Sequence, residues 1–222
     1  MTTLLIATRN AHKVGEIQAL LGGHFRALTL HDFPGAPQVV EDADTLAGNA
    51  VKKAAELARW VAGKPAAPEF VLADDSGLEV DALNGAPGVH SARFAALDRP
   101  ANDPATAGNS PDADNNAKLL RLLKNVPLAK RTARFRCVIA LVPVPRQNSP
   151  APAAGPQTFD GACTGRIQLT AAGRGGFGYD PLFVPDGLAQ SFAELGEDVK
   201  NTLSHRAKAL AKLKKFLGRN DA

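Results

Sequence analysis

Two adjacent carboxylates, Asp74 and Asp75, directly follow an apolar run at residues 70–73 and precede Ser76 and a glycine. Carboxylate oxygens are preferred ligands of Mg²⁺, and a carboxylate can also orient or deprotonate an attacking water. The run predicts a buried strand that ends at Asp74. If the strand continued, the two side chains would point to opposite faces, and only one would face a substrate. The alternative is a polar turn closed by an Asx-type hydrogen bond.

A second acidic group, Glu41-Asp42-Ala43-Asp44, precedes a predicted helix that begins near Thr45. Its carboxylates can complete a metal shell around the aspartates. Acidic residues before a helix are also ordinary capping and dipole partners, so the pattern has a structural explanation as well.

Polar residues also follow the first apolar run, at residues 4–7. The segment consists of Thr8, Arg9, Asn10, Ala11, His12 and Lys13. Backbone N–H groups at a helix start, together with hydroxyl, amide and ammonium groups, can hold phosphate. The segment lacks the glycines and the Lys-Ser/Thr pair of a P-loop. Thr and Asn are also common helix-entry residues, which is the structural alternative.

Residues 173–181 form a glycine-rich segment that contains Phe177, Gly178, Tyr179 and Asp180. It formally matches G-x-G-x-x-G, but Pro181 and an apolar strand follow it instead of a helix, which argues against a dinucleotide site. Such a loop can approach a flat ligand closely and stack an aromatic ring on it. A tight turn with core aromatics explains the segment equally well.

Several hydrogen-bond donors gather around the start of the last predicted helix, namely Lys200, His205 and Arg206. Such donors can meet the carbonyl oxygens of a purine. Taken alone, His205 is better explained as an ordinary surface histidine.

The elements that must position these groups alternate between strands and helices early in the chain. Asn10 is a predicted helix cap, and Ser191 with Glu194 has the spacing of a capping box. Further strands are predicted at 132–142, 158–167 and 182–184, the first two as an antiparallel hairpin. A helix from Leu203 onward would bury Leu203, Ala207, Leu210, Leu213 and Leu217. This order predicts an α/β fold with a mixed sheet.

The 222 residues, 45% hydrophobic and 22% charged, fit one domain over 1–222. Cys137 and Cys163 lie in apolar runs and are expected to be buried thiols. The start has no signal-peptide pattern and no apolar run is long enough to span a membrane, so we expect a cytoplasmic protein without a membrane partner. The net charge is +4, and a basic stripe, formed by Lys208, Lys212, Lys215 and Arg219, marks the last helix. A solvated helix face explains it better than a nucleic-acid site.

In order and spacing these motifs resemble the inosine-triphosphate pyrophosphatase family, which hydrolyses non-canonical purine nucleoside triphosphates. The resemblance covers residues 5–217. It rests on Thr8-x-Asn10-x-x-Lys13, Asp74-Asp75-Ser76-Gly77-Leu78, the run from Gly85 to Arg93, Gly175-Gly176-Phe177-Gly178-Tyr179-Asp180-Pro181 and Ser204-His205-Arg206. It implies an elongated mixed sheet flanked by helices, two lobes with a central substrate cleft, and a homodimer.

The resemblance also implies roles for single residues. Mg²⁺-dependent hydrolysis of ITP, dITP or XTP would yield the monophosphate and pyrophosphate, with Asp75 as general base and metal ligand and Glu41 as a second ligand. The segment from Thr8 to Lys13 would hold the triphosphate, with Ser76 as a further contact. Phe177 would stack on the purine, with Gly178, Tyr179 and Asp180 beside it. The 6-oxo group would be recognised by Lys200, His205 and Arg206.

The chain departs from the family pattern in two ways. Many relatives have two acidic residues before the helix that begins at Thr45, whereas this chain has Val40-Glu41-Asp42. The loops at 99–112 and 143–157 look long, and we expect them to alter the surface or dimer rim without altering the chemistry. Two rival functions stay open: a related pyrophosphatase acting on modified pyrimidine or other nucleotides, and a basic nucleic-acid-binding module.

Overall fold

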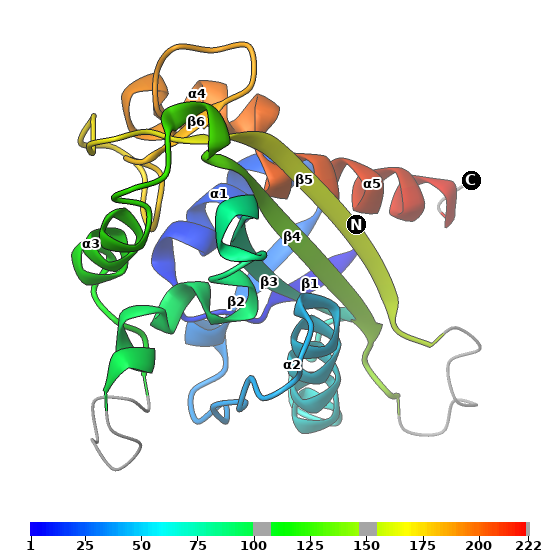
Figure 1. Ribbon diagram of the computed structural model, residues 1–222. Helices are drawn as coiled ribbons and strands as arrows, with labels where there is room; N and C mark the ends of the chain where they lie inside the picture. The colour runs from blue at the N-terminus through cyan, green and yellow to red at the C-terminus, as the bar shows by residue number, and fades with distance from the viewer. Residues whose placement is uncertain (100–107, 147–154, 221–222) are drawn as a thin grey trace. The chain divides into compact units, whose positions relative to one another are not determined.

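The computed structural model describes residues 1–99, 108–146 and 155–220. They contain a six-stranded sheet with the strand order β2-β1-β3-β4-β5-β6 (Figure 1). The strands are β1 (Thr3–Ile6), β2 (Arg26–Thr29), β3 (Phe70–Val80), β4 (Thr132–Pro143), β5 (Gln157–Ile167) and β6 (Phe183–Pro185). β1 pairs in parallel with β2 and β3, whereas β5 and β6 are antiparallel. The predicted α/β fold with a mixed sheet flanked by helices is confirmed.

Contacts divide the chain into two units. The first comprises Met1–Asp75, Cys137–Gly161 and Arg206–Ala222, and the second comprises Ser76–Arg136 and Ala162–His205. Three of the four boundaries fall within β3, β4 and β5, so three strands contribute residues to both units; the fourth falls between His205 and Arg206.

In the first unit, side-chain caps define where two helices begin. α1 (Ala11–Leu21) follows Asn10, whose side chain accepts from the Lys13 N–H, and α2 (Leu46–Val61) follows Thr45, which accepts from the Gly48 N–H. Each cap satisfies one of the otherwise unpaired N–H groups of the first turn. α5 (His205–Asn220) packs Ala209, Leu210, Leu213 and Leu217 into the same core as Leu4, Ile6, Ile17 and Leu72. The predicted cap at Asn10 and the predicted helix that begins near Thr45 are confirmed.

The second unit has its own core around three phenylalanines. Phe135 and Phe183 have ring centroids 4.7 Å apart, and Phe183 and Phe192 are 5.4 Å apart. α3 (Asp112–Leu122) adds Leu119 to this core, and α4 (Phe192–Leu203) begins at the predicted capping box of Ser191 and Glu194. Aromatic rings at these separations stabilise a core beyond their buried area alone.

One local prediction about the last helix needs correction, and others lie outside the described residues. Leu203 ends α4 and is 38% exposed, and it is separated from α5 by Ser204, so it does not belong to the apolar stripe of α5. The basic side chains of Lys208, Lys212 and Lys215 are exposed, as expected. The side chain of Arg219 and much of the loops predicted at 99–112 and 143–157 lie outside the described residues.

β3 does not end at Asp74 but continues to Val80, so the prediction of a strand that ends there was wrong. Gly77 is the reason that the polar segment can stay in the sheet. A Cβ atom at this position would overlap the carbonyl oxygen of Gly88, because the Gly85-Ala86-Pro87-Gly88 segment passes close to the strand. Ser91 joins the two segments, accepting from the Leu78 N–H at 2.9 Å and donating to the Gly88 carbonyl at 2.6 Å.

Gly77→Ala is therefore expected to destabilise the protein by about 1–3 kcal/mol through overpacking against backbone that cannot move aside easily. Gly15→Ala, in α1 with open space around the added methyl group, is the matched control and should gain up to about 1 kcal/mol from helix propensity. Urea denaturation of both variants measures the difference. Equal midpoints would contradict the close approach at Gly77.

Candidate active site

Asp74 and Asp75 are neighbours in β3, and both are buried, with exposed fractions of 1% and 6%. Side chains alternate along a strand, so the two carboxylates point to opposite faces of the sheet. Their partners differ accordingly. The carboxylate of Asp74 is held by several donors, whereas Oδ2 of Asp75 has no hydrogen-bond partner among the described residues.

Asp74 is the centre of a buried ion network in the first unit. Its oxygens contact Lys13 Nζ and, at 3.0 Å, Arg206 Nε, while Arg206 Nη1 contacts Glu16. Cys137 Sγ lies 3.0 Å from Asp74 Oδ2. Burial opposes ionisation of Asp74, but the charges of Arg206 and Lys13 hold its pKa well below the usual range. Two cations thus balance two carboxylates, which is the condition for burying all four.

The same network determines the state of Arg206, one of the predicted base-recognition residues. Its side chain is 1% exposed, and burial lowers its pKa, but the charges of Asp74, Cys137 and Glu16 and the hydrogen bond to Asp74 together raise it above the usual value. At least part of its donor capacity is directed at carboxylates of its own unit. Sequence reasoning did not foresee this pairing, because 132 residues separate Arg206 from Asp74.

Asp75 has the opposite electrostatic character. Burial raises its pKa to about 6, against the opposing charges of Lys13 and Lys53 and with a further contribution from Glu41. A buried carboxylate with an unpartnered oxygen and a raised pKa is poorly stabilised by the protein alone. Such a group fits a role as a cation ligand or a base.

The donor set around Asp75 fits a hard divalent cation. Glu41, the predicted second ligand, is close enough to affect the pKa of Asp75, and its carboxylate contacts Lys53. The residues described contain no group of three or more His, Cys, Asp or Glu side chains placed to hold a metal. The protein can therefore offer a pair of carboxylates, which suits Mg²⁺ because this ion is commonly bound by one or two carboxylates, with waters and substrate phosphates.

Lys53 was missed by the sequence analysis. It lies on the buried face of α2 with Asn49, Ala50, Ala54 and Leu57 and is 9% exposed. A lysine in a row of otherwise buried positions is the signal that could have identified it, because a lysine is almost never buried without a partner. Its charge and that of Lys13 both act on Asp75.

The predicted phosphate-binding segment surrounds the start of α1. Asn10 Oδ1 accepts from the Lys13 N–H at 3.1 Å, and Thr8 Oγ1 accepts from the Asn10 N–H at 3.2 Å. Arg9 donates to the Ala36 carbonyl at 2.6 Å. Ala11 and His12 are exposed in the first turn. The polar side chains of Thr8, Arg9 and Asn10 thus shape the turn, and the helix start with Lys13 provides the positive field for an anion.

In the second unit, Asp180 organises the glycine-rich segment. Its Oδ2 accepts from the Phe177 N–H at 2.9 Å and pairs with Lys200 Nζ at 2.5 Å. Lys200 Nζ also lies 4.3 Å from the centroid of the half-buried Phe177 ring. Of the residues predicted to contact the base, the structure thus brings Phe177, Asp180 and Lys200 together.

Two other predicted contacts are mainly part of the core. Tyr179 is 3% exposed and donates its hydroxyl to the Ser91 carbonyl at 2.9 Å, so the core-aromatic alternative holds for this side chain. His205 is 4% exposed and its ring stacks on Phe135 at 4.8 Å, so the surface-histidine alternative was wrong. Ser76 is half-buried in β3.

Comparison with known proteins finds similarity over nearly the whole chain. The model of the Ham1 family matches residues 4–216. The chain belongs to the Ham1 family. Similar relatives include the dITP/XTP pyrophosphatase of Desulforamulus reducens, 46% identical, and that of Geobacter sulfurreducens, 47% identical. The alignments cover 97% and 98% of this chain and 96% and 98% of those relatives.

Solved structures of the Ham1 family show the same fold. A HAM1 protein from Coxiella burnetii has a TM-score of 0.77 and 34% identity, covering 99% of this chain and 100% of that chain. The Ham1 protein of Staphylococcus aureus has a TM-score of 0.76 and 31% identity, with the same coverage. No helix among the described residues is long and apolar enough to cross a membrane.

The neighbouring aspartates should respond oppositely to loss of charge. Asp74→Asn leaves buried cations without their partner and should destabilise the protein by about 3–5 kcal/mol. Asp75→Asn removes a carboxylate whose ionisation burial disfavours, so in metal-free buffer at pH 8 it should gain on the order of 2 kcal/mol.

Thermal midpoints of the two variants, measured side by side, test the contrast. The variants are matched in side-chain shape and differ by one position in the strand. A comparable loss of stability in both would show that the two carboxylates do not differ in the way described.

Proposed function

We propose that this chain hydrolyses the non-canonical purine nucleoside triphosphates ITP, dITP and XTP to the monophosphate and pyrophosphate, with Mg²⁺ as cofactor. The observation that carries the proposal is the buried Asp75 carboxylate, with one oxygen unpartnered and with Lys13, Lys53 and Glu41 around it. Relatives of this chain that are named dITP/XTP pyrophosphatase align with it over nearly their full length. They support the proposed substrate class.

In this proposal the first unit binds the triphosphate and activates water. Lys13 and the N–H groups at the start of α1 bind phosphate oxygens, and Lys53 adds a second positive charge. Asp75 orients a water for attack on the α-phosphorus and accepts its proton, and pyrophosphate leaves. Asp75 and Glu41 would hold Mg²⁺, which would neutralise part of the phosphate charge. Positioning and electrostatic stabilisation dominate in such reactions.

Of the residues proposed to recognise the base, Phe177, Lys200 and His205 belong to the second unit and Arg206 to the first. Phe177 stacks on the purine, while Lys200, His205 and Arg206 donate towards the 6-oxo group of hypoxanthine or xanthine. Adenine presents an amino donor at that position, which would leave buried donors unpaired and therefore bind poorly. Because Arg206 is also paired with Asp74 and Glu16, its orientation is held by carboxylates, which suits a fixed donor.

The proposal includes a homodimer without a nucleic-acid or membrane partner, acting in the cytoplasm. These points rest on the resemblance and the sequence. Size-exclusion chromatography with light scattering tests the dimer.

Substrate class and metal can be tested in one assay of pyrophosphate release. We expect release from ITP, dITP and XTP with Mg²⁺, little release from ATP or dUTP, and none in EDTA. Equal release from ITP and ATP would remove the 6-oxo recognition, and preferential release from dUTP would favour the pyrimidine alternative. The absence of release from every nucleotide, with salt-sensitive RNA or DNA binding, would favour the nucleic-acid module.

Asp75→Asn is expected to lower kcat for ITP by roughly 10²–10⁴-fold, the usual contribution of a general base. ITP binding, measured by isothermal titration calorimetry in Ca²⁺ or EDTA, should remain detectable. Asp42→Asn is the matched control, since Asp42 is exposed and paired only with Lys52 in the described contacts, and it should keep wild-type kcat. Full activity in Asp75→Asn would contradict its role as the base.

A further inference from the structure

Both main-chain polar groups of Gly178 are bound by side chains of one helix. Asp112 Oδ2, at the start of α3, accepts from the Gly178 N–H at 2.6 Å. One turn later, Asn116 Nδ2 donates to the Gly178 carbonyl at 3.0 Å. Residues four apart lie on the same face of a helix, so the two side chains form a clamp around a single peptide residue.

The clamped glycine lies in a segment whose conformation needs such support. Gly176 and Gly178 have φ values of 72° and 63°, in the left-handed region that favours glycine. The segment from 173 to 178 contains four glycines, which lose more conformational freedom on ordering than other residues. Asp180 fixes the N–H of Phe177, and the clamp fixes the next residue along the chain.

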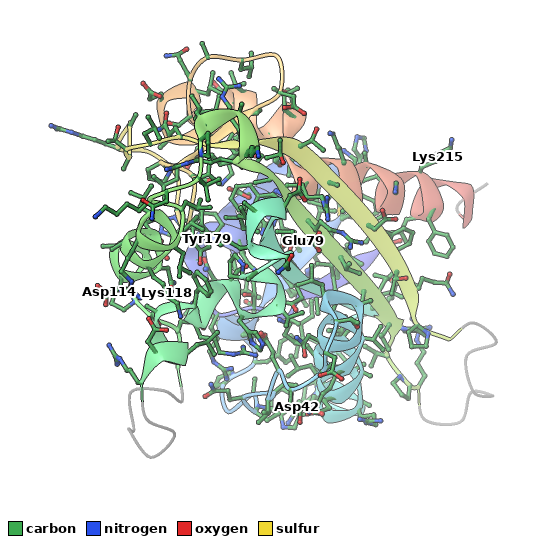
Figure 2. All side chains as sticks on the ribbon, in the orientation of Figure 1. Asp42, Glu79, Asp114, Lys118, Tyr179 and Lys215 are labelled. Carbon is green, nitrogen blue, oxygen red and sulfur yellow. The ribbon has the colours of Figure 1, made fainter. Side chains whose placement is uncertain are left out.

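α3 is itself firmly attached to the second unit. Asn115 is 3% exposed, accepts from the Ala95 N–H at 2.8 Å and donates to the Ala92 carbonyl at 3.3 Å. Lys118 Nζ donates to the Phe94 carbonyl at 2.7 Å. The helix therefore connects the segment around Ala92, which belongs to the Gly85–Arg93 motif, with the glycine-rich segment. Figure 2 shows Tyr179 near the α3 residues Asp114 and Lys118.

A simpler explanation for Asp112 is that its negative charge stabilises the helix by interacting with the positive, N-terminal end of the helix dipole. Asp114 lies in the same first turn and has the same charge, so a dipole role would make the two residues equivalent. Of these two aspartates, only Asp112 contacts the glycine-rich segment in the described hydrogen bonds. Its charge also helps to raise the pKa of Tyr179, after burial as the main cause. Asp112 therefore lies against this segment as well as at the helix end.

We propose that Asp112 and Asn116 are positioning residues that hold the Phe177–Gly178 backbone in place, so that the Phe177 ring is ready to stack on a purine. The proposal rests on the proposed function for the identity of the ligand. The clamp itself consists of hydrogen bonds within the second unit and does not depend on the ligand. Neither side chain contacts the reacting atoms, so their effect is on binding of the base and not on the chemical step.

Steady-state kinetics with ITP tests the role in binding. Asp112→Ala and Asn116→Ala should each raise KM about tenfold, the effect of about 1.4 kcal/mol, while kcat stays within about twofold. Inhibition by inosine monophosphate should weaken in parallel. Inhibition by tripolyphosphate, which has no base, should stay unchanged. Because both side chains hold one residue, the double variant should lose less than the sum of the single losses.

Two matched variants separate positioning from folding. Asp114→Ala removes the same charge from the same helix turn and should leave KM unchanged, whereas Asp112→Asn keeps an acceptor and should restore most of the wild-type KM. Amide hydrogen exchange of residues 173–181, measured by mass spectrometry, should be faster in Asp112→Ala than in Asp114→Ala. This readout is independent of catalysis.

The outcomes distinguish the two proposals. A wild-type protein that does not hydrolyse ITP rules out the proposed function. Hydrogen exchange then still decides whether the clamp exists. An active wild type whose clamp variants match Asp114→Ala in both KM and exchange overturns the positioning role. A rise in the inhibition constant of tripolyphosphate equal to that of inosine monophosphate overturns it too, because the effect would not be specific to the base.

Discussion

The constraint on which the first unit depends is the need to neutralise Asp74 inside the protein. Its carboxylate is 1% exposed and contacts Lys13 and Arg206, and Arg206 also contacts Glu16. Each of these charges would be costly to bury alone, so all four must be present together. The network thereby fixes α1, β3 and α5 to one another although they come from distant parts of the sequence. The predicted phosphate-binding Lys13 is positioned by the same contacts that stabilise the fold.

The alternation of side chains along a single strand places Asp74 and Asp75 in different environments. Asp74 faces the cations and its pKa is held well below the usual range, while burial raises that of Asp75 to about 6. Environments that shift the pKa values of neighbouring carboxylates in opposite directions allow identical groups to take different roles. Keeping Asp75 buried and incompletely paired lowers the stability of the protein. The ion network around Asp74 can offset this loss.

Local signals in the sequence were enough to predict most helices and strands, because caps and apolar spacing are short-range. Asn10 and Ser191 cap the helices they were expected to cap, and a helix begins near Thr45 as predicted. The errors came from contacts between distant residues. β3 continues past Asp74 because Gly77 admits the backbone of Gly88, and His205 is buried because it stacks on Phe135. Neither partner can be identified from neighbouring residues, and the same holds for the pairing of Arg206 with Asp74.

The glycine-rich segment is a second example of a feature that depends on residues distant in the sequence. Its glycines permit the backbone turns that present Phe177, but they also make an ordered conformation entropically costly. A loop that must bind a flat ligand tightly gains by being ordered beforehand, since ordering on binding would weaken affinity. The side chains that supply this order, Asp112, Asn116 and Asp180, include two from a helix more than sixty residues earlier in the chain. The glycine pattern therefore indicates where the aromatic ring is presented, whereas the rigidity that makes it useful is encoded in a helix with no recognisable motif of its own.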